Sequence, residues 1–211
     1  MLKYIYAEDL KTQPKLADTM FRHRALQFRD RLKWESVTVD ENGHERDEYD
    51  AMNPLYVIWQ NADGTHGGSM RVLPTTGQTM VNDHFLHLTN GVPIISPFIW
   101  ESTRFCLAPG ATPKIAGALM LAGMEIGLRF HLDHAVGVFD ARMVRVYRYH
   151  GWAPTVVGTE GAGRDAISVG LWEFSEDVRA RLAEKAGISL ALSEHWFEQS
   201  FGSARVMAQS A

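Results

Sequence analysis

The chain has 211 residues, of which 45% are hydrophobic and 22% charged, and this length and composition predict one globular domain spanning residues 1–211. The net charge of −4 argues against a strongly basic surface, so we expect no nucleic-acid partner. The lone Cys106, a start without a long apolar run, and no stretch near the roughly 20 apolar residues of a membrane helix predict a cytoplasmic protein without an integral membrane segment.

The first half of the chain predicts one helix, one long polar loop and three strands. Apolar spacing predicts a helix over 14–29, but it also places Arg24 on the apolar face, which calls for a functional reason. Residues 31–52 are polar and acidic and predict a loop. Strands are predicted at 55–59, 69–73 and 98–107.

The second half alternates helices and strands. Thr112 and Pro113 are typical of a helix start and predict a largely buried helix to about residue 130. A strand is expected at 134–139, a helix at 141–150 closed by Gly151, a strand at 167–174, and a helix from Ser175 to about Lys185. The segment GTEGAG at 158–163 is interpreted as a turn. This order of elements predicts a mixed sheet with helices on both faces.

Three groups of side chains depart from plain patterning. They are Arg24 with Phe28 and Trp34, Asp47 and Asp50 with Arg71, and Glu101 with Arg104 in the segment WESTRF. Taken singly, each has an ordinary explanation as a solvated acidic loop or a structural ion pair. Together they supply the groups that bind a zwitterion bearing a sulfonium and an adenine, namely aromatic rings, carboxylates and guanidinium groups. Because side chains alternate along a strand, we also predict a β-bulge that re-aims Glu101 or Arg104.

A metal site is not predicted. The loop DENGHERDEYD has Glu45 where a calcium loop needs its sharp-turn glycine, and the paired histidines lack further ligands at suitable spacing. Cys106 has no recognisable histidine partner and is expected to be a buried structural thiol.

The pattern of residues in the first half resembles that of the acyl-homoserine-lactone synthase (autoinducer synthase) family. The shared residues are Arg24, Phe28, Trp34, DEYD at 47–50, MRVLPTTG at 70–77, Phe85 in NDHF, and WESTRF at 100–105. The resemblance implies an α/β (α+β) fold, a three-layer α/β/α sandwich with a mixed central sheet similar to the N-acetyltransferase superfamily. It also implies an S-adenosyl-L-methionine cleft in about residues 1–110 and an acyl-chain tunnel in about residues 111–211.

The same resemblance implies a reaction. An acyl group passes from acyl carrier protein to the amino group of S-adenosyl-L-methionine, and lactonisation then releases methylthioadenosine and gives a quorum-sensing signal. S-adenosyl-L-methionine is a consumed substrate, so no cofactor is expected. The implied catalytic residues are Glu101, as the base for the amine, with Arg24, Asp47, Arg71 and Arg104. The implied substrate-binding residues are Phe28, Trp34, Asp50, Phe85, Ser102 and Phe105.

The acyl donor is inferred from the start of the helix at 112–130. Acetyltransferase relatives hold the pyrophosphate of coenzyme A in a glycine-rich turn at a helix start. Here the segment APGATPKIAG lacks that spacing and has Pro113 where an amide is needed, which favours an acyl carrier protein, although acyl-coenzyme A stays open. The three arginines Arg142, Arg145 and Arg148 form a basic stripe that we interpret as its docking site, although a solvated helix face would have the same pattern.

The acyl tunnel is the least specific prediction. Its candidate lining residues are Met120, Met124, Phe139 and Trp172, which are equally typical of a core. Family members that prefer 3-oxo chains tend to carry a threonine in the central strand, and residues 137–140 read GVFD here. The resemblance therefore argues against a 3-oxo product and leaves the chain length open.

Two other functions remain open at this point. An ordinary N-acyltransferase that uses acyl-coenzyme A would share the fold, but it does not explain Trp34, DEYD and WESTRF together. A non-catalytic module that binds S-adenosyl-L-methionine would be marked by a lost residue in the set, and none is lost.

Overall fold

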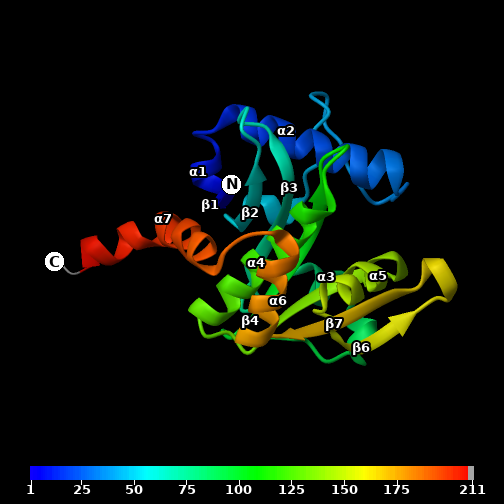
Figure 1. The fold of residues 1–211 in the computed structure, drawn as a ribbon. Helices are drawn as coiled ribbons and strands as arrows, with labels where there is room; N and C mark the ends of the chain where they lie inside the picture. Colours follow the sequence, from blue (N-terminus) through cyan, green and yellow to red (C-terminus); the bar gives the residue numbers. More distant parts are fainter. Residues whose placement is uncertain (209–211) are drawn as a thin grey trace.

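The computed structural model describes residues 1–208, in which seven strands form one sheet in the order β1-β2-β3-β4-β5-β7-β6 (Figure 1). The strands are β1 Leu2–Tyr6, β2 Leu55–Gln60, β3 His66–Pro74, β4 Ile99–Leu107, β5 His134–Asp140, β6 Thr155–Glu160 and β7 Ile167–Glu173. β4 and β5 are parallel, and the other neighbouring strands are antiparallel. The predicted mixed sheet is confirmed.

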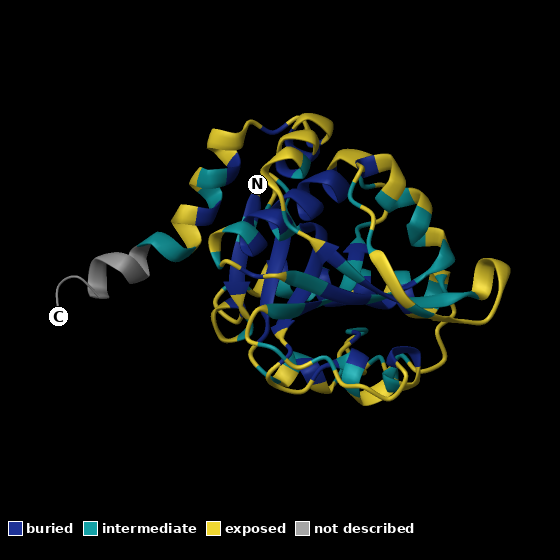
Figure 2. Cartoon of the chain, turned by 90° about the horizontal axis from the view of Figure 1, so that it is seen from below, coloured by how far each residue is buried: buried dark blue, intermediate teal, exposed yellow. Residues whose placement is uncertain are grey.

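Helices cover both faces of this sheet. They are α1 Ala7–Leu10, α2 Pro14–Ala25, α3 Met80–His84, α4 Pro113–Arg129, α5 Ala141–His150, α6 Glu176–Ala186 and α7 Leu190–Ala208. Apolar side chains of α2 pack on Ile5, Tyr56 and Ile58, whereas α4 packs on the opposite face of β1, β2 and β3. α6 lies against α4, and the buried residues gather between the layers (Figure 2). The three-layer α/β/α arrangement is therefore confirmed.

Local sequence signals account for most of the element ends. Thr112 precedes Pro113 at the start of α4, although the Thr112 side chain makes no capping hydrogen bond. Gly151 ends α5 with a φ of +73°, and the Ser175 hydroxyl accepts a hydrogen bond from the N–H of Val178 at the start of α6. These ends confirm the predicted helix boundaries.

Five of these helices and strands were not predicted, namely β1, α1, α3, β6 and α7. β6 includes residues 158–160, so the interpretation of GTEGAG as a turn was wrong for its first half. β6 is an edge strand without alternating burial, so its sequence carries no period-two signal. The first predicted helix ends at Ala25 and continues as a π-helical segment, Leu26–Arg31.

β4 and β5 are paired over only three residues. Ile99, Trp100 and Glu101 lie opposite residues 134–136, and beyond this point the two strands separate. The separation opens the sheet between its two halves and positions the site described next.

Candidate active site

A β-bulge in β4 directs the Arg104 side chain. Ser69 lies opposite Cys106, and Arg71 lies opposite Thr103, so two steps along β3 (69 to 71) face three steps along β4 (103 to 106). Arg104 has a φ of +53°, in the left-handed region that non-glycine residues rarely adopt. The predicted bulge is confirmed, and it turns the Arg104 guanidinium toward the loop that carries the acidic run.

Three arginines and three carboxylates meet on the α2 side of the sheet. The Arg24 Nε donates to Glu45 Oε2 at 2.5 Å, and its two terminal nitrogens each donate to Asp50 at 2.9 Å. Arg71 pairs with Asp47 and with Asp50, at 2.9 Å from Asp50 Oδ1. We call this set, which Arg104 completes, the charge cluster.

Arg104 joins the charge cluster from the bulge. Its NH2 lies 2.8 Å from Asp47 Oδ2, and its Nε donates to Glu45 Oε1 at 3.1 Å. With Arg24 and Arg71 the cluster holds three guanidinium groups against three carboxylates, so its formal charges balance. Charge balance is what allows buried ionic groups to be tolerated.

The acidic loop is held by its own capping interactions as well as by the arginines. The Asp47 side chain accepts hydrogen bonds from the N–H groups of Tyr49 and Asp50, and the Asp50 side chain accepts one from the N–H of Asp47. The Tyr56 hydroxyl donates to Asp50 at 2.6 Å. Burial alone would raise the pKa of Asp50, but the charge and hydrogen bonds of Arg24, with Arg71, hold it well below its usual range.

An aromatic pair lies next to the charge cluster. The rings of Phe28 and Trp34 stack with centroids 5.0 Å apart, and the Arg104 guanidinium lies 5.5 Å from the Phe28 centroid. The π-helical segment supplies Phe28, and the N–H of Trp34 donates to the Phe28 carbonyl at 3.0 Å. Phe28 is buried, whereas Trp34 keeps 38% of its surface exposed and can meet a ligand.

Glu101 lies where β4 and β5 separate, beneath the start of α3. Its carboxylate accepts hydrogen bonds from the N–H of Val81 at 2.6 Å and the N–H of Met80 at 3.0 Å. Burial raises the pKa of Glu101 to about 7, despite the opposing effect of these two N–H groups. A carboxyl group with a pKa near neutrality is suited to exchange a proton under ordinary conditions.

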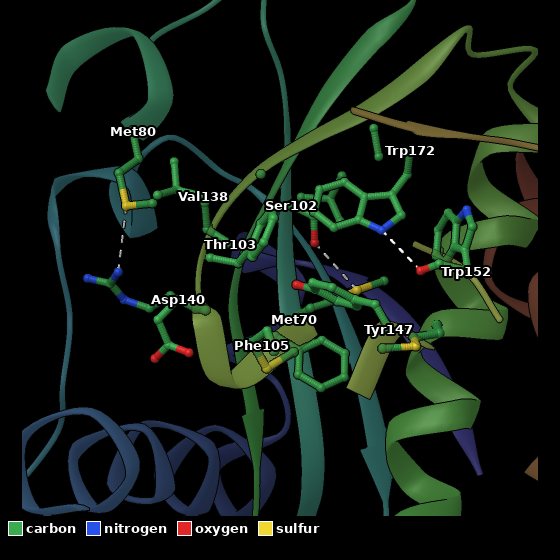
Figure 3. Close-up of a pocket in the computed structure, with 18 of the residues that line it drawn as sticks. Met70, Met80, Ser102, Thr103, Phe105, Val138, Asp140, Tyr147, Trp152 and Trp172 are labelled. Atoms are coloured by element: carbon green, nitrogen blue, oxygen red, sulfur yellow. Dashed lines mark hydrogen bonds between the residues drawn. The ribbon is translucent and has the colours of Figure 1, made fainter. Parts of the chain in front are cut away.

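One cavity is lined by residues from both faces of the sheet, next to the point where the pairing of β4 and β5 ends (Figure 3). On the α2 side it is lined by Phe28, Trp34, Met80 and Arg104, and on the α4 side by Met70, Met120, Gly123 and Ile126. Ser102, Phe105, Phe139 and Trp172 also line it. The cavity thus joins a polar and aromatic region to a long apolar region.

Several predicted site residues lie away from this cavity. Glu101 and Asp50 are buried behind it, and Phe85 packs against the apolar cluster that includes Val81 and Val136. Met124, predicted as a tunnel residue, is buried in the core, where its sulfur accepts a hydrogen bond from the N–H of Ser175 at 3.4 Å, and it is not among the lining residues of this cavity.

Glu45 and Tyr147 are among the site residues that the sequence did not predict. Glu45, which is fully buried, joins Arg24 to Arg104, and Tyr147 on α5 lines the cavity. The position of Glu45 two residues before Asp47 was visible, but nothing in a polar loop distinguishes a buried carboxylate. Tyr147 has a weak signal, since it lies between the arginines of the basic stripe.

Arg145 and Arg148 of the basic stripe lie on the surface of α5, whereas Arg142 also lines the cavity. Arg142, Arg145 and Arg148 are exposed, and Arg142 NH1 lies 3.2 Å from Asp140 Oδ2. Cys106 is buried, and burial raises the pKa of its thiol to about 12. Within residues 1–208, no cluster of three or more histidine, cysteine or acidic side chains could hold a metal ion, and no helix is long and apolar enough to cross a membrane.

Comparison with known proteins agrees with this geometry. A sequence model of the family described as autoinducer synthase matches residues 8–182. An acyl-homoserine-lactone synthase of Rhizobium etli is 39% identical over 184 residues, which cover 84% of this chain and 86% of that protein.

Two solved structures share the fold. The acyl-homoserine lactone synthase BjaI, described as CoA-dependent and solved with SAM and isopentyl-CoA, superposes with a TM-score of 0.79 at 21% identity, over 89% of this chain and 90% of BjaI. A putative N-acetyltransferase from Lactobacillus plantarum superposes with a TM-score of 0.54 at 13% identity, over 82% of this chain and 99% of that one. The expected similarity to N-acetyltransferases is confirmed. The chain belongs to the autoinducer synthase family, and it is an acyltransferase of the acyl-homoserine-lactone synthase type.

Proposed function

We propose that this acyl-homoserine-lactone synthase transfers the acyl group of an acylated carrier protein to the amino group of S-adenosyl-L-methionine and then closes the lactone, releasing methylthioadenosine. The observation that carries the proposal is the single cavity that joins the Phe28–Trp34 pair and Arg104 to the apolar region under α4. S-adenosyl-L-methionine occupies the first part and the acyl chain the second. In this proposal the S-adenosyl-L-methionine cleft belongs to about residues 1–110 and the acyl-chain tunnel to about residues 111–211.

The polar part of the cavity suits the charges of S-adenosyl-L-methionine. The exposed face of Trp34 offers a surface for the adenine or the sulfonium, and Arg104 offers a guanidinium for the carboxylate. Arg24, Arg71 and Asp50 are at most 4% exposed and hold this arrangement from behind. BjaI, whose structure was solved with SAM, has the same fold and supports this assignment.

Proton removal is assigned to Glu101. A free α-amino group has a pKa of about 7.7 to 8.0, so much of it is protonated near neutrality and must lose a proton before it attacks the thioester. Glu101 is held by the N–H of Met80, whose side chain lines the cavity, so we propose that it acts through a water molecule. The edge of β4 that faces β5 has no partner strand beyond Glu101, and its N–H groups can stabilise the oxyanion.

Lactonisation needs only the substrate itself. The carboxylate of S-adenosyl-L-methionine attacks its own γ-carbon, and the bond to sulfur breaks to release neutral methylthioadenosine. The enzyme contributes by holding the carboxylate and the γ-carbon in position. Of the three guanidinium groups in the charge cluster, that of Arg104 is the most exposed and is the one that lines the cavity.

Two features favour a carrier protein over coenzyme A as donor. α4 begins at Pro113, which lacks the first-turn N–H that could bind a pyrophosphate, and α5 exposes three arginines to an acidic partner. A CoA-dependent relative with the same fold keeps acyl-coenzyme A as the second candidate. The localisation we propose is cytoplasmic, where both donors are made.

Mass spectrometry of one reaction tests the function and the donor. Purified enzyme is given S-adenosyl-L-methionine with acyl carrier protein or acyl-coenzyme A thioesters, and we expect equimolar methylthioadenosine and N-acyl-homoserine lactone from the carrier-protein thioester. An acylated amine without methylthioadenosine would replace this function by ordinary N-acyl transfer.

The docking stripe is tested separately. Reversing Arg145 and Arg148 to glutamate should raise the KM for the carrier protein in a salt-dependent way and leave kcat unchanged. An unmoved KM would assign the stripe to ordinary solvated surface.

A further inference from the structure

Tyr147 places a hydroxyl group in a part of the cavity that is lined mainly by aromatic side chains. α5 exposes Arg145 and Arg148 and turns Tyr147 inward, where the ring lies 5.4 Å from Phe139 and 5.1 Å from Trp172 between centroids. Figure 3 shows Tyr147, Trp172 and Ser102 projecting into the same part of the cavity. This part of the cavity is on the side assigned above to the acyl chain.

The Tyr147 hydroxyl makes no hydrogen bond to any residue that the structure describes. The two neighbouring indoles do find partners: Trp172 donates to the Trp152 carbonyl at 3.3 Å, and Trp152 donates to the Glu173 carbonyl at 2.8 Å. Ser102 has only a weak contact, since its hydroxyl donates to the Met70 sulfur at 3.6 Å. The cavity therefore contains hydrogen-bonding capacity that the protein itself does not use.

The proposed function places the reacting end of the acyl chain where the pairing of β4 and β5 ends, and Tyr147 contacts β5 shortly beyond that point. At Gly137 an added Cβ would lie 3.0 Å from the Ser102 carbonyl, so the backbones of β4 and β5 still approach closely there. Phe139, which Tyr147 contacts, lies two residues further, or about 7 Å along the strand. The first carbons after the thioester would pass this point.

An acyl chain that fills the cavity must displace the water that the hydroxyl can otherwise bind. A plain hydrocarbon chain would leave the Tyr147 hydroxyl buried without a partner, which is unfavourable. A chain with an oxygen atom at this point would restore the hydrogen bond. Residues 137–140 of β5 carry no hydroxyl group, and Tyr147 brings one from α5.

We propose that the transferred acyl group carries a hydroxyl or keto oxygen near its thioester end, and that Tyr147 recognises this oxygen by a hydrogen bond. The proposal rests on the function proposed above, because it requires the acyl chain to occupy this cavity. Tyr147 is then a specificity-determining residue that acts on the substrate and not on the chemistry.

The test compares three donors of equal chain length: an unsubstituted, a 3-hydroxy and a 3-oxo acyl thioester. Release of methylthioadenosine by the full-length enzyme gives kcat/KM for each. The wild-type enzyme should prefer one oxygenated donor by roughly 10- to 100-fold. Tyr147→Phe should abolish the preference, lowering kcat/KM for that donor and raising it for the unsubstituted one.

Tyr149→Phe is the matched control, since Tyr149 lies on the same helix with 64% of its surface exposed and should keep the wild-type preference. A wild-type preference for the unsubstituted donor, or an equal loss for all three donors in Tyr147→Phe, would overturn the proposal. If Tyr147→Phe does not fold, competition among the three donors on the wild-type enzyme still tests the preference for an oxygenated chain, and a preference for the unsubstituted donor would overturn the proposal. If no donor yields methylthioadenosine, the proposed function itself is overturned. This outcome differs from a loss of the preference among donors, which overturns only the role of Tyr147.

Discussion

Glu45 offers the sharpest test of the charge cluster. Glutamine at this position keeps the shape of the side chain but leaves three guanidinium groups with two carboxylates in a buried site. Glu45 is 0% exposed and accepts from Arg24 at 2.5 Å and from Arg104 at 3.1 Å. Removing one partner of a buried ion pair costs about 3–5 kcal/mol. In a chain of this size we expect Glu45→Gln to lower the melting temperature by roughly 6–20 °C.

The assay is thermal and urea unfolding of Glu45→Gln beside three further variants, namely Asp30→Asn, Arg104→Met and the double variant of Glu45→Gln with Arg104→Met. Asp30→Asn removes a carboxylate of the exposed pair with Arg29, whose side chains are 42% and 49% exposed, and should leave the melting temperature nearly unchanged. Arg104→Met combined with Glu45→Gln removes one charge of each sign, so the double variant should lose about 1–3 kcal/mol less than the sum of the single losses. A fall of less than about 2 °C in Glu45→Gln, or strict additivity in the double variant, would refute the view that the cluster needs charge balance.

Three further predictions follow from burial and packing. Glu101→Gln should lower kcat by roughly 10²- to 10⁴-fold, because the variant lacks the base that takes the proton of the amine. The wild-type rate should also fall as the pH drops below about 7, where Glu101 becomes protonated. Unchanged turnover of the variant would show that Glu101 is not this base. Burial lowers the pKa of His66 from 6.5 to about 3. Between these two pH values the unfolded chain binds a proton that the folded chain does not, so the free energy of unfolding should fall by about 1.4 kcal/mol per pH unit as the pH drops below 6.5. Urea titrations measure this slope, and a His66→Gln variant with the same slope would contradict the prediction. At Gly127 an added Cβ would lie 2.1 Å from the Phe174 ring, so Gly127→Ala should lower the free energy of unfolding by about 1–3 kcal/mol. The control is Gly202→Ala, whose added Cβ would have its nearest atom at 4.0 Å and should not destabilise the protein. Equal melting temperatures for the two variants would show that the Phe174 ring moves freely.

Most of the charged residues of the site could be predicted from the sequence, but the contacts between them could not. Arg24 on an apolar helix face and the bulge in WESTRF were visible because each breaks a local period, and both lead to the charge cluster. Glu45 breaks no period, and its partners lie 21 and 59 residues away in the chain. The missed edge strand β6 has the same cause, since its pairing with β7 and not its own pattern makes it a strand.

The charged residues of the site differ in how deeply they are buried, and this difference assigns them different roles that the sequence motif does not distinguish. Arg24, Arg71 and Asp50 are at most 4% exposed and are satisfied by partners within the charge cluster, so a substrate group could reach them only by displacing an ion pair. Arg104 and Asp47 are each 11% exposed, and Arg104 lines the cavity. The left-handed backbone of Arg104 is unfavourable in isolation and persists because Glu45 and Asp47 bind its guanidinium. Substitutions of the buried members should therefore act by releasing Arg104 from its place, whereas a substitution of Arg104 removes the guanidinium that meets the substrate.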